Sequence, residues 1–206
     1  MSDRSRIIIS GGPITNTARL YVTLDYFGLS ARTSLLDGGI DAWREEGRPA
    51  SRSTPLVTKG NVTLTRSPAR VVDAAWIVGN AELPATRVRV IDARAPEFFV
   101  GLAANNTPRA GHLPTAANIP FTWMTGELGR FRDRPSLERL FRQAGVNTGD
   151  KVVSYCHIGM QASVLYVAAR VLGFEAALYD GSFEDWSRRS ELPVSTGAPP
   201  RTPIVR

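Results

Sequence analysis

The most informative stretch of the chain is VVSYCHIGMQAS, which runs from Val152 to Ser163. It opens as a short, apolar and β-branched run, which is typical of a buried strand. A tight loop with Cys156 and Gly159 follows, and the amphipathic pattern over Gln161–Leu172 then predicts a helix. A strand that passes through a loop into a helix predicts a parallel α/β sheet. The cysteine then lies at the carboxyl end of a strand, where such sheets bind ligands.

Cys156 is the strongest candidate for a chemical role. Backbone N–H groups of the loop can converge on its sulfur, and the dipole of the following helix adds positive potential there. Both effects favour the thiolate, so we expect a nucleophile that is ionised near neutral pH. Gly159 lets the backbone bend around the anion because it has no Cβ. A lone cysteine is often a small core residue, but its position at a strand end favours the nucleophile.

Residues 7–29 repeat the pattern of residues 152–174. In both copies an apolar strand leads through a loop into an amphipathic helix and a glycine, and a second strand then reaches Asp-Gly and a tryptophan. Only residues 1–6 precede the first copy, whereas further strand and helix patterns precede the second. The first copy has Gly11 at the position of Cys156. We therefore interpret residues 1–50 as the C-terminal half of a degenerate, inactive domain.

The rest of the chain divides into three parts. Residues 51–68 are rich in proline, serine and threonine and are predicted to be a linker. Residues 69–196, beginning as early as residue 56, are predicted to form the catalytic domain, and residues 197–206 a flexible tail. Outside the two copies, the patterns predict strands at Val62–Thr65, Val88–Asp92 and Ala117–Ile119, and helices at Ala69–Asn80 and Ser136–Ala144.

Composition narrows the class of protein. Hydrophobic residues make up 43% of the chain, and no apolar run is long enough for a membrane span. A single cysteine excludes an internal disulfide and, with no signal-peptide pattern, predicts a cytoplasmic protein. The net charge is +6, but the arginines are scattered, so we expect neither a nucleic-acid nor a membrane partner. Two distant histidines and one cysteine lack metal-ligand spacing, so no metal and no cofactor are expected.

Three further motifs accompany the cysteine loop in a fixed order. They are DARAPEF at Asp92–Phe98, GHLPTAANIP at Gly111–Pro120 and YDGSFEDW at Tyr179–Trp186. With the pattern Cys-x-x-Gly-x-x-Ala they resemble the rhodanese superfamily of thiosulfate and 3-mercaptopyruvate sulfurtransferases, over about residues 56–195. The resemblance implies a rhodanese-like α/β domain with a parallel central sheet covered by helices on both faces. A partial second copy precedes it here, as in a tandem protein with a truncated first domain.

The resemblance also implies a reaction. Cys156 takes a sulfane sulfur from a small anionic donor such as thiosulfate, becomes a persulfide, and passes the sulfur to cyanide or a thiol. Arg94 matches the family arginine that holds the anionic group of the donor. The implied donor site also includes the loop residues His157, Ile158, Gly159, Met160 and Gln161. A partly cationic His157 would favour thiosulfate over 3-mercaptopyruvate.

Alternatives to this interpretation remain open. A cysteine phosphatase needs Cys-x5-Arg, and residue 162 is alanine, which disfavours that reaction. A sulfur-relay or sulfur-sensing module without turnover would carry the same motifs. The incomplete first copy reflects a start site assigned too late, a decayed gene, or completion by a second chain in a homodimer. Asp92 and His112 are expected to have structural roles, and no pattern indicates where Arg109 points.

Overall fold

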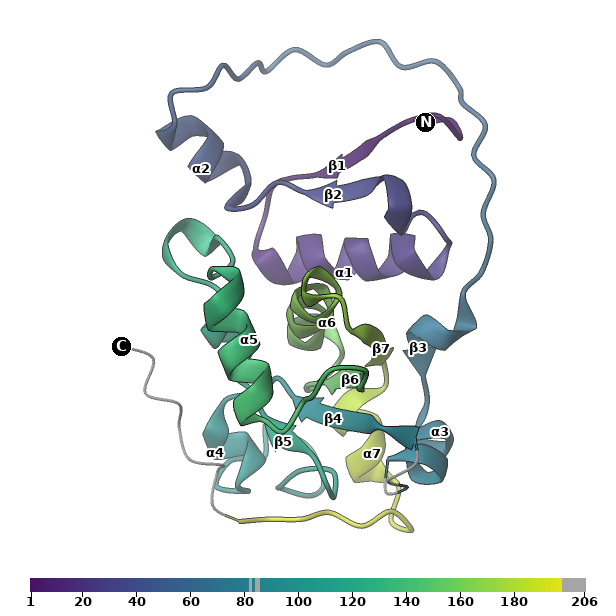
Figure 1. Ribbon diagram of the computed structural model, residues 1–206, viewed down its shortest axis with the longest axis vertical. Coiled ribbons are helices and arrows are strands. Elements are labelled where there is room, and N and C mark those ends of the chain that lie inside the picture. Colours follow the sequence, from purple (N-terminus) through teal and green to yellow (C-terminus); the bar gives the residue numbers. More distant parts are fainter. Residues whose placement is uncertain (82, 84–85, 198–206) are drawn as a thin grey trace.

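The computed structural model describes residues 1–81, 83 and 86–197 (Figure 1). Its main body contains a five-stranded, fully parallel sheet with the strand order β3-β7-β6-β4-β5. The strands are β3 (Val71–Val72), β4 (Val88–Asp92), β5 (Ala117–Asn118), β6 (Lys151–Tyr155) and β7 (Glu175–Tyr179). β6 is the central strand, and its last four residues are buried.

Helices cover both faces of this sheet, because alternate residues of each strand point to opposite sides. Val152 packs in an apolar cluster with residues of α5 and α6, whereas Val153 packs in a second cluster with residues of α3 and α7. The helices of the body are α3 (Ala74–Asn80), α4 (Pro96–Phe99), α5 (Arg134–Gln143), α6 (Met160–Leu172) and α7 (Ser182–Arg188). The predicted fold class, a parallel α/β sheet flanked by helices, is confirmed.

The N-terminal segment forms a separate two-stranded parallel sheet with its own helices. Its elements are β1 (Ile7–Ile9), α1 (Ile14–Tyr26), β2 (Thr33–Leu35) and α2 (Gly39–Glu45). The order of elements is the same in β1-α1-β2-α2 and in β6-α6-β7-α7, as the internal repeat predicts. The division of the chain into domains, and the origin of the first copy, stay predictions.

Helix α1 attaches this segment to the body by packing against α6 (Figure 1). Ala18 and Val22 of α1 are buried in the same apolar cluster as the inner face of α6. Asp25, also of α1 and buried, accepts a hydrogen bond from the Tyr166 hydroxyl at 2.6 Å and lies 3.4 Å from the Nε of Arg170. The N-terminal segment therefore shares core and buried polar contacts with the main body.

Two predicted elements differ in the structure. Residues 62–65 form no strand; the Thr65 N–H instead donates to the Phe27 carbonyl at 3.1 Å, beyond the end of α1. The helix predicted over Ala69–Asn80 begins only at Ala74, because Val71–Val72 pairs with β7.

Short 3-10 turns occupy Ser30–Arg32, Pro68–Arg70, Phe121–Trp123 and Glu127–Gly129. Apart from residue 197, the predicted tail lies outside the described residues, and no helix within them is both long and apolar enough to cross a membrane.

Candidate active site

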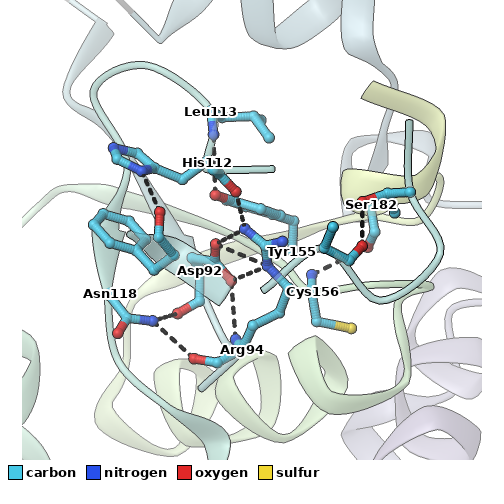
Figure 2. A network of polar contacts seen from close by, with 12 residues as sticks. Asp92, Arg94, His112, Leu113, Asn118, Tyr155, Cys156 and Ser182 are labelled. Carbon is cyan, nitrogen blue, oxygen red and sulfur yellow. Dashed lines mark hydrogen bonds and ion pairs between the residues drawn. The ribbon is translucent and has the colours of Figure 1, made fainter. Parts of the chain in front are cut away.

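Cys156 lies at the carboxyl end of β6 and is completely buried. Its backbone is held by the start of α7 (Figure 2): its N–H donates to the Ser182 Oγ at 3.2 Å, and its carbonyl accepts from the Phe183 N–H at 2.9 Å. The next carbonyl, of His157, accepts from the Glu184 N–H at 3.1 Å. The Cys156 backbone is therefore fixed by hydrogen bonds to α7, and none of these bonds uses its thiol.

The thiol faces backbone N–H groups of that loop. Those of Ile158, Gly159, Gln161 and Ala162 are directed at it. Gly159 has φ +85° and stands directly before the first residue of α6, so the sulfur lies at a helix N-terminus. Converging N–H groups and a helix dipole form a site for an anion.

Burial nevertheless has the larger effect on the free thiol. Removal from water raises the pKa of Cys156 above its ordinary value, while the surrounding N–H groups lower the pKa by a smaller amount. The expectation of a thiol ionised near neutral pH is therefore not supported, because desolvation outweighs the loop and helix dipoles on which it rested. The same N–H groups still offer the main stabilisation for any negative charge that forms on sulfur at this position.

The side chains of the loop differ in their exposure to solvent. Ile158 is exposed, while His157, Met160 and Gln161 are half-buried. The His157 ring packs edge-on against Phe98, with ring centroids 4.6 Å apart. Burial, together with the nearby charge of Arg94, lowers the pKa of His157, so its imidazole is neutral at pH 7. This removes the partly cationic histidine that sequence reasoning took as favouring thiosulfate.

Two buried polar atoms of the loop form no hydrogen bond within the described part of the chain. Nδ1 of His157 and Oε1 of Gln161 have no hydrogen-bond partner among the residues that the structure describes. Buried polar atoms are normally paired. Both side chains belong to the loop around the sulfur.

Arg94 lies at the end of β4 in a fully buried ion pair (Figure 2). Its Nε is 3.0 Å from both carboxylate oxygens of Asp92, and its Nη2 donates to Asp92 Oδ2 and to the Gly111 carbonyl, each at 2.6 Å. The guanidinium carbon is 4.1 Å from the ring centre of Phe183. The donor-binding role of Arg94 stays a prediction; the contacts present connect β4 to the turn that begins at Gly111.

Three neighbouring residues, Asp92, His112 and Arg109, form hydrogen bonds within the fold. Asp92 pins its turn by accepting from the Arg94 N–H at 2.9 Å, as the sequence predicts. His112 stacks on Phe99 and hydrogen-bonds its carbonyl through Nδ1 at 2.7 Å. Arg109, whose direction no pattern indicated, donates to backbone carbonyls in and after α7, those of Trp186, Ser187, Arg189 and Leu192.

Sequence reasoning missed two residues that adjoin the loop. Ser182 belongs to the YDGSFEDW motif, but only the structure shows that its Oγ accepts from the Cys156 N–H and donates to the Tyr179 carbonyl. Arg19 comes from α1, and its Nη1 is 2.5 Å from Asp180 Oδ1, beside Gly159. No sequence signal could have found Arg19, because 161 residues separate the two partners of the ion pair.

Comparisons with known proteins show which family the chain resembles. The family model of the rhodanese-like domain matches residues 74–189. "Putative thiosulfate sulfurtransferase SseB" of Mycobacterium tuberculosis is 32% identical over 181 residues, which are 88% of this chain and 63% of that protein. "Probable 3-mercaptopyruvate sulfurtransferase" of Pseudomonas aeruginosa is 30% identical over 199 residues, covering 95% of this chain and 69% of that protein.

A solved structure gives the same fold. The crystal structure of YnjE superposes with a TM-score of 0.84 at 23% identity, and the match covers 96% of this chain and 50% of that one. The chain thus spans about three fifths of the length of SseB, at 63%, and half of YnjE. The family match contains the central strand, the cysteine loop and α7, which are the parts that build the site. The chain belongs to the rhodanese-like domain family.

Proposed function

We propose that this protein is a sulfurtransferase that carries sulfane sulfur on Cys156 as a persulfide. The observation that carries the proposal is the set of backbone N–H groups directed at one buried sulfur, at the carboxyl end of the central strand. Such groups stabilise a charged sulfur without a metal or a bound cation. The names of the relatives, which include both thiosulfate and 3-mercaptopyruvate sulfurtransferases, support the same class of reaction.

In the proposed first step, the Cys156 sulfur attacks the outer sulfur of thiosulfate after its proton has passed to solvent. A bond forms between the two sulfur atoms, the sulfur–sulfur bond of thiosulfate breaks, and sulfite leaves with the electron pair. The loop N–H groups then hold the terminal sulfur of the persulfide. In the second step cyanide attacks that sulfur, thiocyanate leaves, and the Cys156 thiolate is restored.

Thiosulfate is the donor that we propose first. The neutral His157 gives no argument for it, but the excess of 25 basic over 19 acidic residues favours a small dianion. We further propose that the unpaired Nδ1 of His157 and Oε1 of Gln161 contact the donor or the leaving group. 3-Mercaptopyruvate is the second donor to be tested, because a relative carries its name.

Intact-protein mass spectrometry tests the proposal. After incubation with thiosulfate and removal of small molecules, the wild-type protein should retain one additional sulfur atom, which cyanide should remove as thiocyanate. Cys156→Ser should retain none. Absence of the added sulfur in wild-type protein with thiosulfate and with 3-mercaptopyruvate would overturn the proposal.

The complete burial of Cys156 favours one alternative, a sulfur-relay or sulfur-sensing module without turnover. A buried sulfur is protected from small acceptors, so such a module would load sulfur and release it only to a dedicated partner. Steady-state formation of thiocyanate distinguishes the two. An enzyme continues past one equivalent, whereas a relay module stops after loading.

A further inference from the structure

The N-terminal segment places a positive charge beside the cysteine loop. Arg19 of α1 forms an ion pair with Asp180, with Nη1 2.5 Å from Oδ1 and side-chain exposures of 32% and 47%. Asp180 directly follows β7, the neighbour of β6 in the sheet. The carboxyl ends of parallel neighbours meet at one edge, so the Asp180 carboxylate lies at the same edge as Cys156.

Gly159 shows how closely the pair approaches the sulfur site. A Cβ at Gly159 would lie 2.9 Å from Asp180 Oδ1 and 3.0 Å from Arg19 Nη1, while the Gly159 N–H is directed at the Cys156 thiol. Gly159 therefore lies between the sulfur, which its N–H faces, and the ion pair, which leaves no room for a side chain at this residue. Asp92 and Arg94, which affect the pKa of the loop residue His157, are already paired with each other.

A carboxylate at this place opposes the chemistry of the loop unless it is neutralised. The loop is arranged to hold a negative charge, and thiosulfate brings two more. Repulsion between such like charges weakens binding by roughly three- to tenfold at an effective dielectric constant of about 20, after a discount for partial exposure. The Arg19 guanidinium cancels most of that field.

We propose that Arg19 is a specificity-determining residue of the sulfur site, which acts by neutralising Asp180 so that the loop accepts an anionic donor. The inference rests on the proposed function and deepens it. Arg19 lies outside residues 74–189, which match the family model, so the N-terminal segment completes the electrostatics of a site in the other part of the chain.

A double-mutant cycle tests this role in the full chain, with kcat/KM for thiosulfate in a thiocyanate assay as the readout. Arg19→Gln should lower kcat/KM by roughly three- to tenfold, mainly through KM, because it exposes the Asp180 charge. Asp180→Asn should raise kcat/KM, because it leaves Arg19 unpaired. The double variant should return close to wild type. The deficit of Arg19→Gln should also shrink as ionic strength rises, which a purely structural defect would not do.

Two further variants serve as controls for charge and for position. Arg19→Lys preserves the charge and should retain most of the activity, and Arg44→Gln, on α2 and paired with Asp41, should leave KM unchanged. A double variant as impaired as Arg19→Gln would overturn the proposal, because Arg19 would then bind the donor directly. Unchanged kinetics in Arg19→Gln would overturn it as well. Failure of wild-type protein to form the persulfide would instead refute the proposed function.

Discussion

Ser182 and Cys156 are joined by a hydrogen bond between the Ser182 Oγ and the Cys156 N–H, 3.2 Å in length. Ser182 holds this position with φ +54°, a left-handed backbone that residues other than glycine rarely adopt. The Ser182 hydroxyl also donates to the Tyr179 carbonyl at 2.9 Å, so one side chain connects the ends of β6 and β7. Strain of this kind persists only where surrounding contacts stabilise it.

Ser182→Ala should therefore destabilise the protein by about 1–3 kcal/mol, because a buried backbone N–H and a carbonyl each lose a partner. Ser182→Gly loses the same bonds, but relief of the left-handed backbone offsets roughly 1 kcal/mol of the cost. Urea unfolding measures both. A Gly variant less stable than the Ala variant would contradict the assignment of backbone strain.

Gly159→Ala should abolish sulfur loading. Its φ of +85° disfavours any side chain, and the new Cβ would meet Asp180 Oδ1 at 2.9 Å, which would displace the loop N–H groups from the sulfur. Gly145→Ala is the matched control, because φ there is +80° but no atom lies within 4 Å of the new Cβ. Both variants should lose about 1–2 kcal/mol of stability from backbone strain. Only Gly159→Ala should fail to gain a sulfur atom by mass, and equal loading of the two would refute the role of this glycine.

Arg94→Ala should mainly lower the stability of the folded protein, whether or not it also weakens donor binding. It leaves the Asp92 carboxylate buried and unpaired, which typically destabilises a protein by about 3–5 kcal/mol. In a double-mutant cycle, Asp92→Ala with Arg94→Ala should lose much less than the sum of the single changes. Denaturant unfolding without donor is the measurement. An Arg94→Ala variant as stable as wild type, with only a raised KM, would instead assign Arg94 directly to the donor.

Low pH should destabilise the folded protein by protonating Asp150, which directly precedes β6. Burial opposes ionisation of this carboxylate, but the Asn147 N–H, Arg89 and Arg87 together hold the pKa of Asp150 below its ordinary value. Because the pKa is lower in the folded protein, the stabilisation is fully present above the unfolded-state pKa, near 3.9. It is lost as the pH falls through the folded-state pKa.

Asp150→Asn should therefore reduce stability by on the order of 1 kcal/mol at pH 7, since both arginines are partly exposed. The difference between the variant and wild type should narrow below about pH 4. Thermal unfolding between pH 3 and pH 7 follows the effect. A difference that does not change with pH would exclude ionisation of Asp150 as its cause.

Much of the site could be predicted from local pattern. The strand predicted at Val88–Asp92 is β4, and the run from Lys151 to Tyr155 is β6. Both are rich in β-branched residues, which favour a strand whatever their neighbours are. The loop and helix after Cys156 follow from the glycine and from helical periodicity. The strand predicted at Val62–Thr65 was wrong for the same reason: a β-branched run indicates a strand even where the folded chain pairs it with none.

Sequence pattern was thus enough to predict the parallel fold and the strand, loop and helix around Cys156, since each is encoded within a few consecutive turns or strands. The burial of Cys156, the partner of Arg94 and the approach of Arg19 to Asp180 came only from the folded chain. Desolvation and ion pairing depend on which distant residues enclose a group, and 161 positions separate Arg19 from Asp180. Both effects act between groups that are close in space but distant in sequence. Only the packing of the folded chain could therefore reveal the burial of Cys156 and the Arg19–Asp180 pair.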